Sequence, residues 1–295
     1  MTERVARVAA LLCLLALVSS CEREPTLTDV NDAGTRIVTL APHLSELVFD
    51  AGAGDMLVGV SAYSDFPPEA ASIEIVSDAF TVDQERLRLL APDIVLAWDS
   101  GTPSHVVEEL RTAGYRVETI AAGNLADIGA AIRRIGRLTA REAAAEKVAV
   151  MFEREMLALR EQYSAMTPIT AFYQVSLKPL YTINGAHYIS EILGICGATN
   201  AFAELNELAP AVSVESVVAR DPEAIFAGSA DGNDAFVEWR RWPHLRANRY
   251  ENYFLINSDH IGRPTTRLVA ATASLCESLQ VARENRNAYQ QAKGS

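Results

Sequence analysis

The chain has 295 residues, 49% of them hydrophobic, so it can bury a core as one large domain or two medium ones. Its formal net charge of −12 argues against a nucleic-acid-binding protein, because such proteins present a basic face to phosphate. The charge does not restrict the fold.

The amino-terminal segment has the pattern of a secretory signal. Arg4 and Arg7 precede an apolar run over residues 8–18, which is shorter than the roughly 20 residues of a membrane-spanning helix. The run ends in Val18-Ser19-Ser20-Cys21, which resembles a bacterial lipobox with Cys21 as the lipidated residue. We therefore predict a signal peptide over residues 1–21 and an extracytoplasmic, membrane-anchored protein. An ordinary signal peptide cut near Ser20 is the alternative.

The next segment, residues 22–35, lacks periodicity and is expected to be a flexible tether. After it, apolar runs alternate with helical patterns that end at Gly or before Pro. This alternation is typical of an α/β domain with a mainly parallel sheet. Strands are expected at residues 37–40, 57–60, 93–98 and 117–120, and helices at residues 45–51, 85–90 and 104–113.

A long helical stretch follows, with few breakers. Its two parts cover residues 125–138 and 140–166, and the second could reach roughly 40 Å at 1.5 Å per residue. A helix of this length between two α/β units suggests a rigid connector, with packing on one domain's surface as the alternative. The second half then alternates again. Strands are expected at residues 169–175, 224–227 and 253–257, and helices at residues 187–195, 215–219 and 268–283.

The two halves share short sequence motifs as well as the same alternation of strands and helices. Ser45-Glu46-Leu47 is followed by Gly52-Ala53, and Ser190-Glu191-Ile192 by Gly197-Ala198 at the same spacing. Glu85 and Glu215 each lie seven residues before a proline that precedes an apolar strand.

The repeat predicts two similar α/β lobes joined by one long rigid helix, with a ligand cleft between the lobes, because clefts between domains are preferred ligand sites. Chance similarity of common helix–turn–strand patterns is the alternative. The expected divisions are residues 36–138 for the amino-terminal lobe, 139–166 for the connecting helix, 167–284 for the carboxyl-terminal lobe and 285–295 for a tail.

Motifs for catalysis are missing from the sequence. It contains no phosphate-binding loop, no GxSxG elbow and no HExxH zinc helix. The five histidines show no ligand spacing, so no metal site is indicated. His43 and His260 are expected in loops that could face the cleft. We predict a protein that is not an enzyme and carries no cofactor.

Four aromatic residues lie near expected strand ends or in loops, where α/β sheets present ligand-contacting residues. Core packing is the alternative for each, and exposure is expected for Tyr63. The residues are Tyr63, Phe80, Trp98 and Tyr181.

Two cysteines remain once Cys13 and Cys21 are assigned to the signal. In an oxidising compartment Cys196 and Cys276 favour one disulfide, with two separate buried thiols as the alternative.

The segment from Val60 to Pro68, Val-Ser-Ala-Tyr-Ser-Asp-Phe-Pro-Pro, closely resembles the VSxYSDxPP segment of the periplasmic cobalamin-binding proteins of ABC importers. Other matches follow in order, including the run Ala91-Pro92-Asp93-Ile94-Val95, which siderophore- and haem-binding relatives share. The resemblance extends over residues 36–282. It implies the helical-backbone class of binding proteins, with cobalamin in the cleft as transported ligand.

The resemblance also implies roles for individual residues. Tyr63 and Trp98 would contact the ligand from the first lobe, and Asp259 and Arg263 would meet polar groups from the second. Cys196 and Cys276 match the family's disulfide. Glu85 and Glu215 match two glutamates, one per lobe, that dock onto arginines of the membrane permease. The alternative for these two is that they are ordinary first-turn helix glutamates, which the helix dipole favours.

The chain departs from the family pattern at two aromatic positions. A family tryptophan after Val76-Ser77 is replaced by Ala79-Phe80, and another aligns with Ala209. Phe80 and Tyr181 are the candidates to take their places. The leading interpretation is a cobalamin-binding protein of an importer. A ferric siderophore or haem in the same fold is the first alternative, and an extracytoplasmic enzyme or sensor domain is the second.

Overall fold

The computed structural model describes residues 34–294, which form one compact unit from Thr35 onward. The predicted signal peptide, Cys21 and nearly all of the predicted tether lie outside the described residues.

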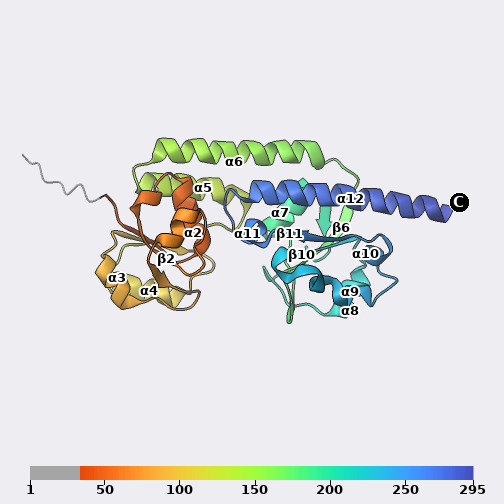
Figure 1. Cartoon of the computed structure of the whole chain (residues 1–295), viewed down its shortest axis with the longest axis horizontal. Coiled ribbons are helices and arrows are strands. Elements are labelled where there is room, and N and C mark those ends of the chain that lie inside the picture. The colour runs from red at the N-terminus through yellow and green to blue at the C-terminus, as the bar shows by residue number, and fades with distance from the viewer. Residues whose placement is uncertain (1–33, 295) are drawn as a thin grey trace, which may run out of the picture. The chain divides into compact units, whose positions relative to one another are not determined.

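The first lobe is built on a five-stranded parallel sheet in the order β3-β2-β1-β4-β5 (Figure 1). Its strands are short apolar runs because helices cover both faces of the sheet. The strands are β1 (Ile37–Thr39), β2 (Leu57–Ser61), β3 (Ile75–Ser77), β4 (Ile94–Trp98) and β5 (Val117–Ile120), and the helices are α2 (Pro42–Asp50), α3 (Gln84–Leu90), α4 (Ser104–Thr112) and α5 (Leu125–Leu138).

The second lobe is built on a four-stranded parallel sheet in the order β11-β10-β6-β9. A small antiparallel hairpin, β7 with β8, lies beside it. The strands are β6 (Ile169–Gln174), β7 (Ser176–Leu177), β8 (Leu180–Tyr181), β9 (Ala198–Asn200), β10 (Ala224–Gly228) and β11 (Tyr253–Ile256), and the helices are α7 (Tyr188–Ile195), α8 (Val214–Arg220), α9 (Val237–Arg240), α10 (Arg246–Arg249), α11 (Ser258–Ile261) and α12 (Leu268–Gly294).

The two sheets repeat one topology. The order β2-β1-β4-β5 corresponds to β9-β6-β10-β11, and the first lobe adds β3 at one edge. Helices α3 and α8 also end alike, at Ala91 and Asp221, which have left-handed backbone conformations (φ 41° and 46°) and precede a proline. The structure therefore carries the repeat that the sequence predicted.

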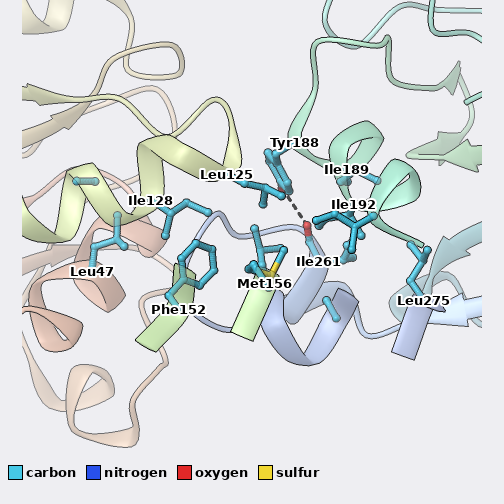
Figure 2. Close-up of a cluster of buried hydrophobic side chains, with 14 of the residues drawn as sticks. Leu47, Leu125, Ile128, Phe152, Met156, Tyr188, Ile189, Ile192, Ile261 and Leu275 are labelled. Carbon is cyan, nitrogen blue, oxygen red and sulfur yellow. Dashed lines mark hydrogen bonds between the residues drawn. The ribbon is translucent and has the colours of Figure 1, made fainter. Parts of the chain in front are cut away.

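One continuous hydrophobic cluster joins the lobes. Helix α6 (Glu142–Tyr163) packs on α5 in the first lobe and on α7 and α12 in the second. Figure 2 shows Met156 of α6 between Ile128 of α5 and Ile192 of α7, all three buried. At 22 residues, α6 is shorter than the predicted span of 140–166. The alternative that it packs on one domain alone is wrong.

A disulfide joins Cys196, at the end of α7, to Cys276 in α12. Both residues are fully buried. The bond closes a stretch with a sequence separation of 80 residues, which contains three strands of the second sheet.

Two expectations are corrected. The predicted tail after residue 284 is helical as far as Gly294, because α12 meets no breaker there and Tyr289 packs against Tyr250 at 5.3 Å. His43 and His260 lie on helices α2 and α11 rather than in loops.

Candidate functional site

A pocket of about 230 Å³ lies at the carboxyl ends of the strands of the first sheet. This edge is where parallel α/β sheets bind ligands. Most of its wall is apolar, and three of the predicted site residues line it: Tyr63, Phe80 and Trp98.

Tyr63 follows β2 and is 81% exposed, in a left-handed backbone conformation (φ 66°). The next residue, Ser64, fixes this turn through buried hydroxyl groups. The Ser64 Oγ lies 3.1 Å from the Ser45 Oγ of α2, which in turn lies 2.6 Å from the Thr39 Oγ1 of β1. The turn is thus tied to the sheet beneath it, with the phenol ring directed to the outside.

Phe80 is presented by an aspartate turn. The carboxylate of Asp78 accepts hydrogen bonds from the backbone N–H groups of Phe80 (2.8 Å) and Thr81 (2.7 Å). These bonds hold the pKa of Asp78 below its usual value. The ring of Phe80 is 79% exposed. Sequence reasoning missed Asp78, although Asp is a residue type that forms such turns by bonding to the backbone two residues on.

Trp98 ends β4, and its ring is closely packed by His43 and Gly101. The His43 ring contacts it edge-on at 4.9 Å between centroids. Gly101 lies so close that a Cβ there would come within 1.8 Å of the indole. The indole Nε1 is buried without a hydrogen-bond partner among the described residues. Trp98 therefore has both roles that the sequence left open, since it packs against the core and lines the pocket.

His43 itself is 4% exposed, and its Nε2 has no partner among the described residues. Burial, with a smaller contribution from the charge of Arg263, lowers the pKa of His43 to about 3. The imidazole is neutral at pH 7.

A second pocket, of about 320 Å³, lies at the carboxyl ends of β6 and β10 in the second lobe. Its lining is more polar and includes Tyr173, His187, Asp231 and Ser258. The His187 Nδ1 accepts a hydrogen bond from the Ile189 N–H at 3.2 Å, and burial lowers the pKa of His187 to about 4. A neutral ring in this setting carries its proton on Nε2 and can donate it to a ligand. Sequence reasoning named none of these four residues as site residues.

The other three predicted ligand contacts line neither pocket. Tyr181 lies in the hairpin strand β8, paired with Ser176, and is 37% exposed. Asp259 is exposed on α11, next to pocket-lining Ser258.

The guanidinium of Arg263, predicted to meet polar groups of the ligand, is engaged by the protein. It donates to Glu46 at 2.9 Å and to Asp65 at 2.6 Å, both in the first lobe. Burial would lower the pKa of Arg263, but these hydrogen bonds outweigh it and the pKa is raised.

Glu85 and Glu215 occupy equivalent places in the two lobes. Each lies in the first turn of a seven-residue helix, α3 and α8, and each is exposed. Asp83 and Ser213 cap the amino-terminal ends of these helices, so the backbone around the two glutamates is held in the same way.

No group of three His, Cys, Asp or Glu side chains within residues 34–294 could hold a metal ion. In the same part of the chain, no helix combines the length and apolar character needed to cross a bilayer.

The model of the periplasmic binding protein family matches residues 37–259, which include both sheets. The chain belongs to this family. A periplasmic binding protein is a solute binder rather than an enzyme and acts outside the cytoplasm, as the sequence predicted.

Curated relatives of this periplasmic binding protein have similar length. A vitamin B12-binding protein of Vibrio parahaemolyticus is 35% identical over 262 residues, covering 88% of this chain and 95% of the relative. One of Pectobacterium atrosepticum is 33% identical over 249 residues, covering 83% and 88%.

Among solved structures, the periplasmic vitamin B12-binding protein of Vibrio cholerae matches with a TM-score of 0.79 at 34% identity, covering 85% of this chain and 98% of that one. A periplasmic haem-binding protein of Vibrio cholerae matches with a TM-score of 0.73 at 20% identity, covering 83% and 98%, and shows a shared fold only. The two-lobed α/β fold predicted from the sequence is confirmed.

Proposed function

We propose that this chain captures cobalamin, or a closely related corrinoid, and delivers it to the permease of an ABC importer. The observation that carries the proposal is the contrast between the two pockets. The first presents apolar and aromatic surface through Tyr63, Phe80 and Trp98, and the second presents polar groups through Tyr173 and His187. A corrin has a broad ring with polar amide groups at its rim, so it can use both kinds of surface.

The names of the curated relatives support the same ligand. Haem is the strongest competitor, because haem-binding proteins share the fold. Haem sites use an axial Tyr or His ligand. The polar pocket contains Tyr173 and His187, but the Nδ1 of His187 is engaged and its Nε2 carries the proton, which disfavours a metal–nitrogen bond there.

Isothermal titration of the purified protein with cyanocobalamin tests the proposal, with haem and a ferric siderophore as controls. We expect stoichiometric binding of cyanocobalamin and no saturable heat from the controls. If haem or the siderophore binds saturably and cyanocobalamin does not, the proposed ligand is wrong, whereas the proposed role in import still holds.

We further propose that Cys21 carries a lipid anchor. Mass spectrometry of the amino-terminal peptide from the membrane fraction tests this, with Cys21→Ser as the control. The expected result is a peptide from the native chain that begins at Cys21 with a lipid-modified thiol, and release of the Cys21→Ser protein from membranes. An unmodified peptide that starts after residue 20 would support the ordinary signal peptide instead.

A further inference from the structure

The sequence repeat contains two glutamates that the proposed function does not use. Glu46 lies in α2 of the first lobe and Glu191 in the matching helix α7 of the second. Glu46 is 2% exposed, and a buried carboxylate needs partners to offset its lost hydration.

Among the described residues, the side chains that donate to Glu46 come from the second lobe, in the connection between α11 and α12. Its Oε1 accepts hydrogen bonds from Arg263 (2.9 Å) and Arg267 (3.1 Å), and its Oε2 accepts one from Thr265 (3.0 Å). One carboxylate thus bonds to three alternate residues of one segment of the other lobe.

The same arginines contact the segment that carries Tyr63. Arg263 also donates to Asp65 at 2.6 Å, and the guanidinium of Arg267 lies over the ring of Phe66 at 4.3 Å. The Tyr-Ser-Asp segment is therefore fixed from two sides: Ser64 ties it to its own sheet, and Asp65 and Phe66 tie it to the other lobe.

Glu191 also faces the other lobe. Its carboxylate lies near the backbone N–H of Leu125, the first residue of α5, and in the field of Arg160 of α6. The glutamate of each Ser-Glu repeat is thus directed toward the other lobe, but only Glu46 is bonded to it by side-chain donors. The Glu191 contact lacks the two direct arginine bonds that Glu46 has.

We propose that Glu46 is a positioning residue that holds the Tyr63-bearing segment of the first lobe against residues 263–267 of the second and so sets the distance between the two pockets. Desolvation cancels much of the attraction in a buried ion pair, so its net contribution to stability is small, and in some proteins such a pair instead fixes one geometry. The consequence for the ligand rests on the proposed function, whereas the consequence for the lobes does not.

The test compares Glu46→Gln with the native protein by two measurements. The first is the distance distribution between spin labels on a ketone-bearing amino acid placed at positions 109 and 241, which are exposed in different lobes. Such labels leave the disulfide untouched. The second is the affinity for cyanocobalamin. We expect a broader distribution in Glu46→Gln and an affinity lower by about tenfold.

Glu118→Gln is the matched control, because Glu118 also lies between two arginines, Arg116 and Arg134, but within the first lobe. It should leave both measurements unchanged. Thr265→Val, which removes one donor to Glu46 and keeps the ion pairs, should broaden the distribution less and serves as the second variant if Glu46→Gln does not fold.

A native distribution in both Glu46→Gln and Thr265→Val would overturn the proposal. Lower affinity with unchanged distances would also overturn it, since Glu46 would then act on the ligand directly. If the native protein binds no cyanocobalamin, the proposed ligand fails, and the label distances still decide whether Glu46 positions the lobes.

Discussion

Phe80 stands where the sequence resemblance leads us to expect a tryptophan, and its exposed ring has few contacts to lose. We expect Phe80→Ala to weaken cyanocobalamin binding by about tenfold, because an aromatic wall contributes roughly 1–2 kcal/mol to a stacked ligand. The thermal midpoint should stay unchanged.

Leu89→Ala is the matched control for this change, since Leu89 is also 79% exposed but lies on α3 outside both pockets. It should alter neither property. Equal affinity of Phe80→Ala and the native protein would remove Phe80 from the site.

Burial of His43 should make the stability of the folded protein depend on pH. The pKa of His43 is about 3 in the folded protein because of burial, against about 6.5 in an unfolded chain, so the unfolded state binds more protons between these values. The free energy of unfolding should therefore fall as pH falls below 6.5, by about 2 kcal/mol at pH 5 from this group.

Asp50 acts in the opposite sense, since burial raises its pKa to about 6 and the folded state then binds the extra proton as pH falls. The contribution of His43 is isolated by comparing urea unfolding of native protein and His43→Gln at pH 7 and pH 5. The variant should lose less stability between the two. An identical loss would mean that His43 does not titrate as its burial implies.

At the scale of elements, the sequence predicts best where local signals agree. Helix α5 was expected at residues 125–138 and lies at Leu125–Leu138, because the capping box of Asn124 and Asp127 fixes its start. Strand β4 likewise follows from the apolar run after Pro92. The hairpin of β7 and β8 was missed, because two-residue strands give no periodic signal.

Contacts between distant segments were beyond such reasoning. Nothing local to Glu46 reveals its bond to Arg263, which is 217 residues away. The family resemblance assigned Arg263 to the ligand, whereas three of its contacts are to protein carboxylates. The shared position of Tyr63 and Trp98 on one pocket could be predicted because strand ends of parallel sheets meet at one edge, which is a property of the fold.

The disulfide is a further contact between elements, since it links the end of α7 to α12. Cross-linking residues with a separation of 80 should stabilise the folded protein relative to the unfolded chain by about 4.5 kcal/mol in the chain-entropy account. We expect the double variant Cys196→Ala/Cys276→Ala to lose most of this in guanidinium unfolding.

Reductant added to the folded native protein is the control. It should leave cyanocobalamin affinity unchanged, because both sulfurs are buried and protected. A double variant as stable as the native protein would mean that the bond contributes little once the core is formed.

At the scale of the whole molecule, the repeat gives each lobe one exposed glutamate on an equivalent short helix. In Figure 1, α3 and α8 each lie on the side of their own lobe away from α6. If these carboxylates pair with arginines of a permease, the two contacts together fix the orientation of the protein on the permease, which a single contact cannot do. Charge pairs at the exposed edge of an interface mainly affect the orientation and the rate of association, and salt weakens them.

We therefore expect Glu85→Ala and Glu215→Ala each to slow cobalamin uptake and the double variant to abolish it, in cells that carry this chain with its own importer. Cyanocobalamin affinity should stay native, since neither residue lines the apolar pocket of the first lobe or the polar pocket of the second. Glu108→Ala and Glu207→Ala, exposed carboxylates of the first and second lobe, are the matched controls and should transport normally. Normal uptake by the double variant would show that Glu85 and Glu215 are first-turn residues that serve only their helices, whereas loss of uptake together with loss of binding would point to a change in the lobes rather than to docking.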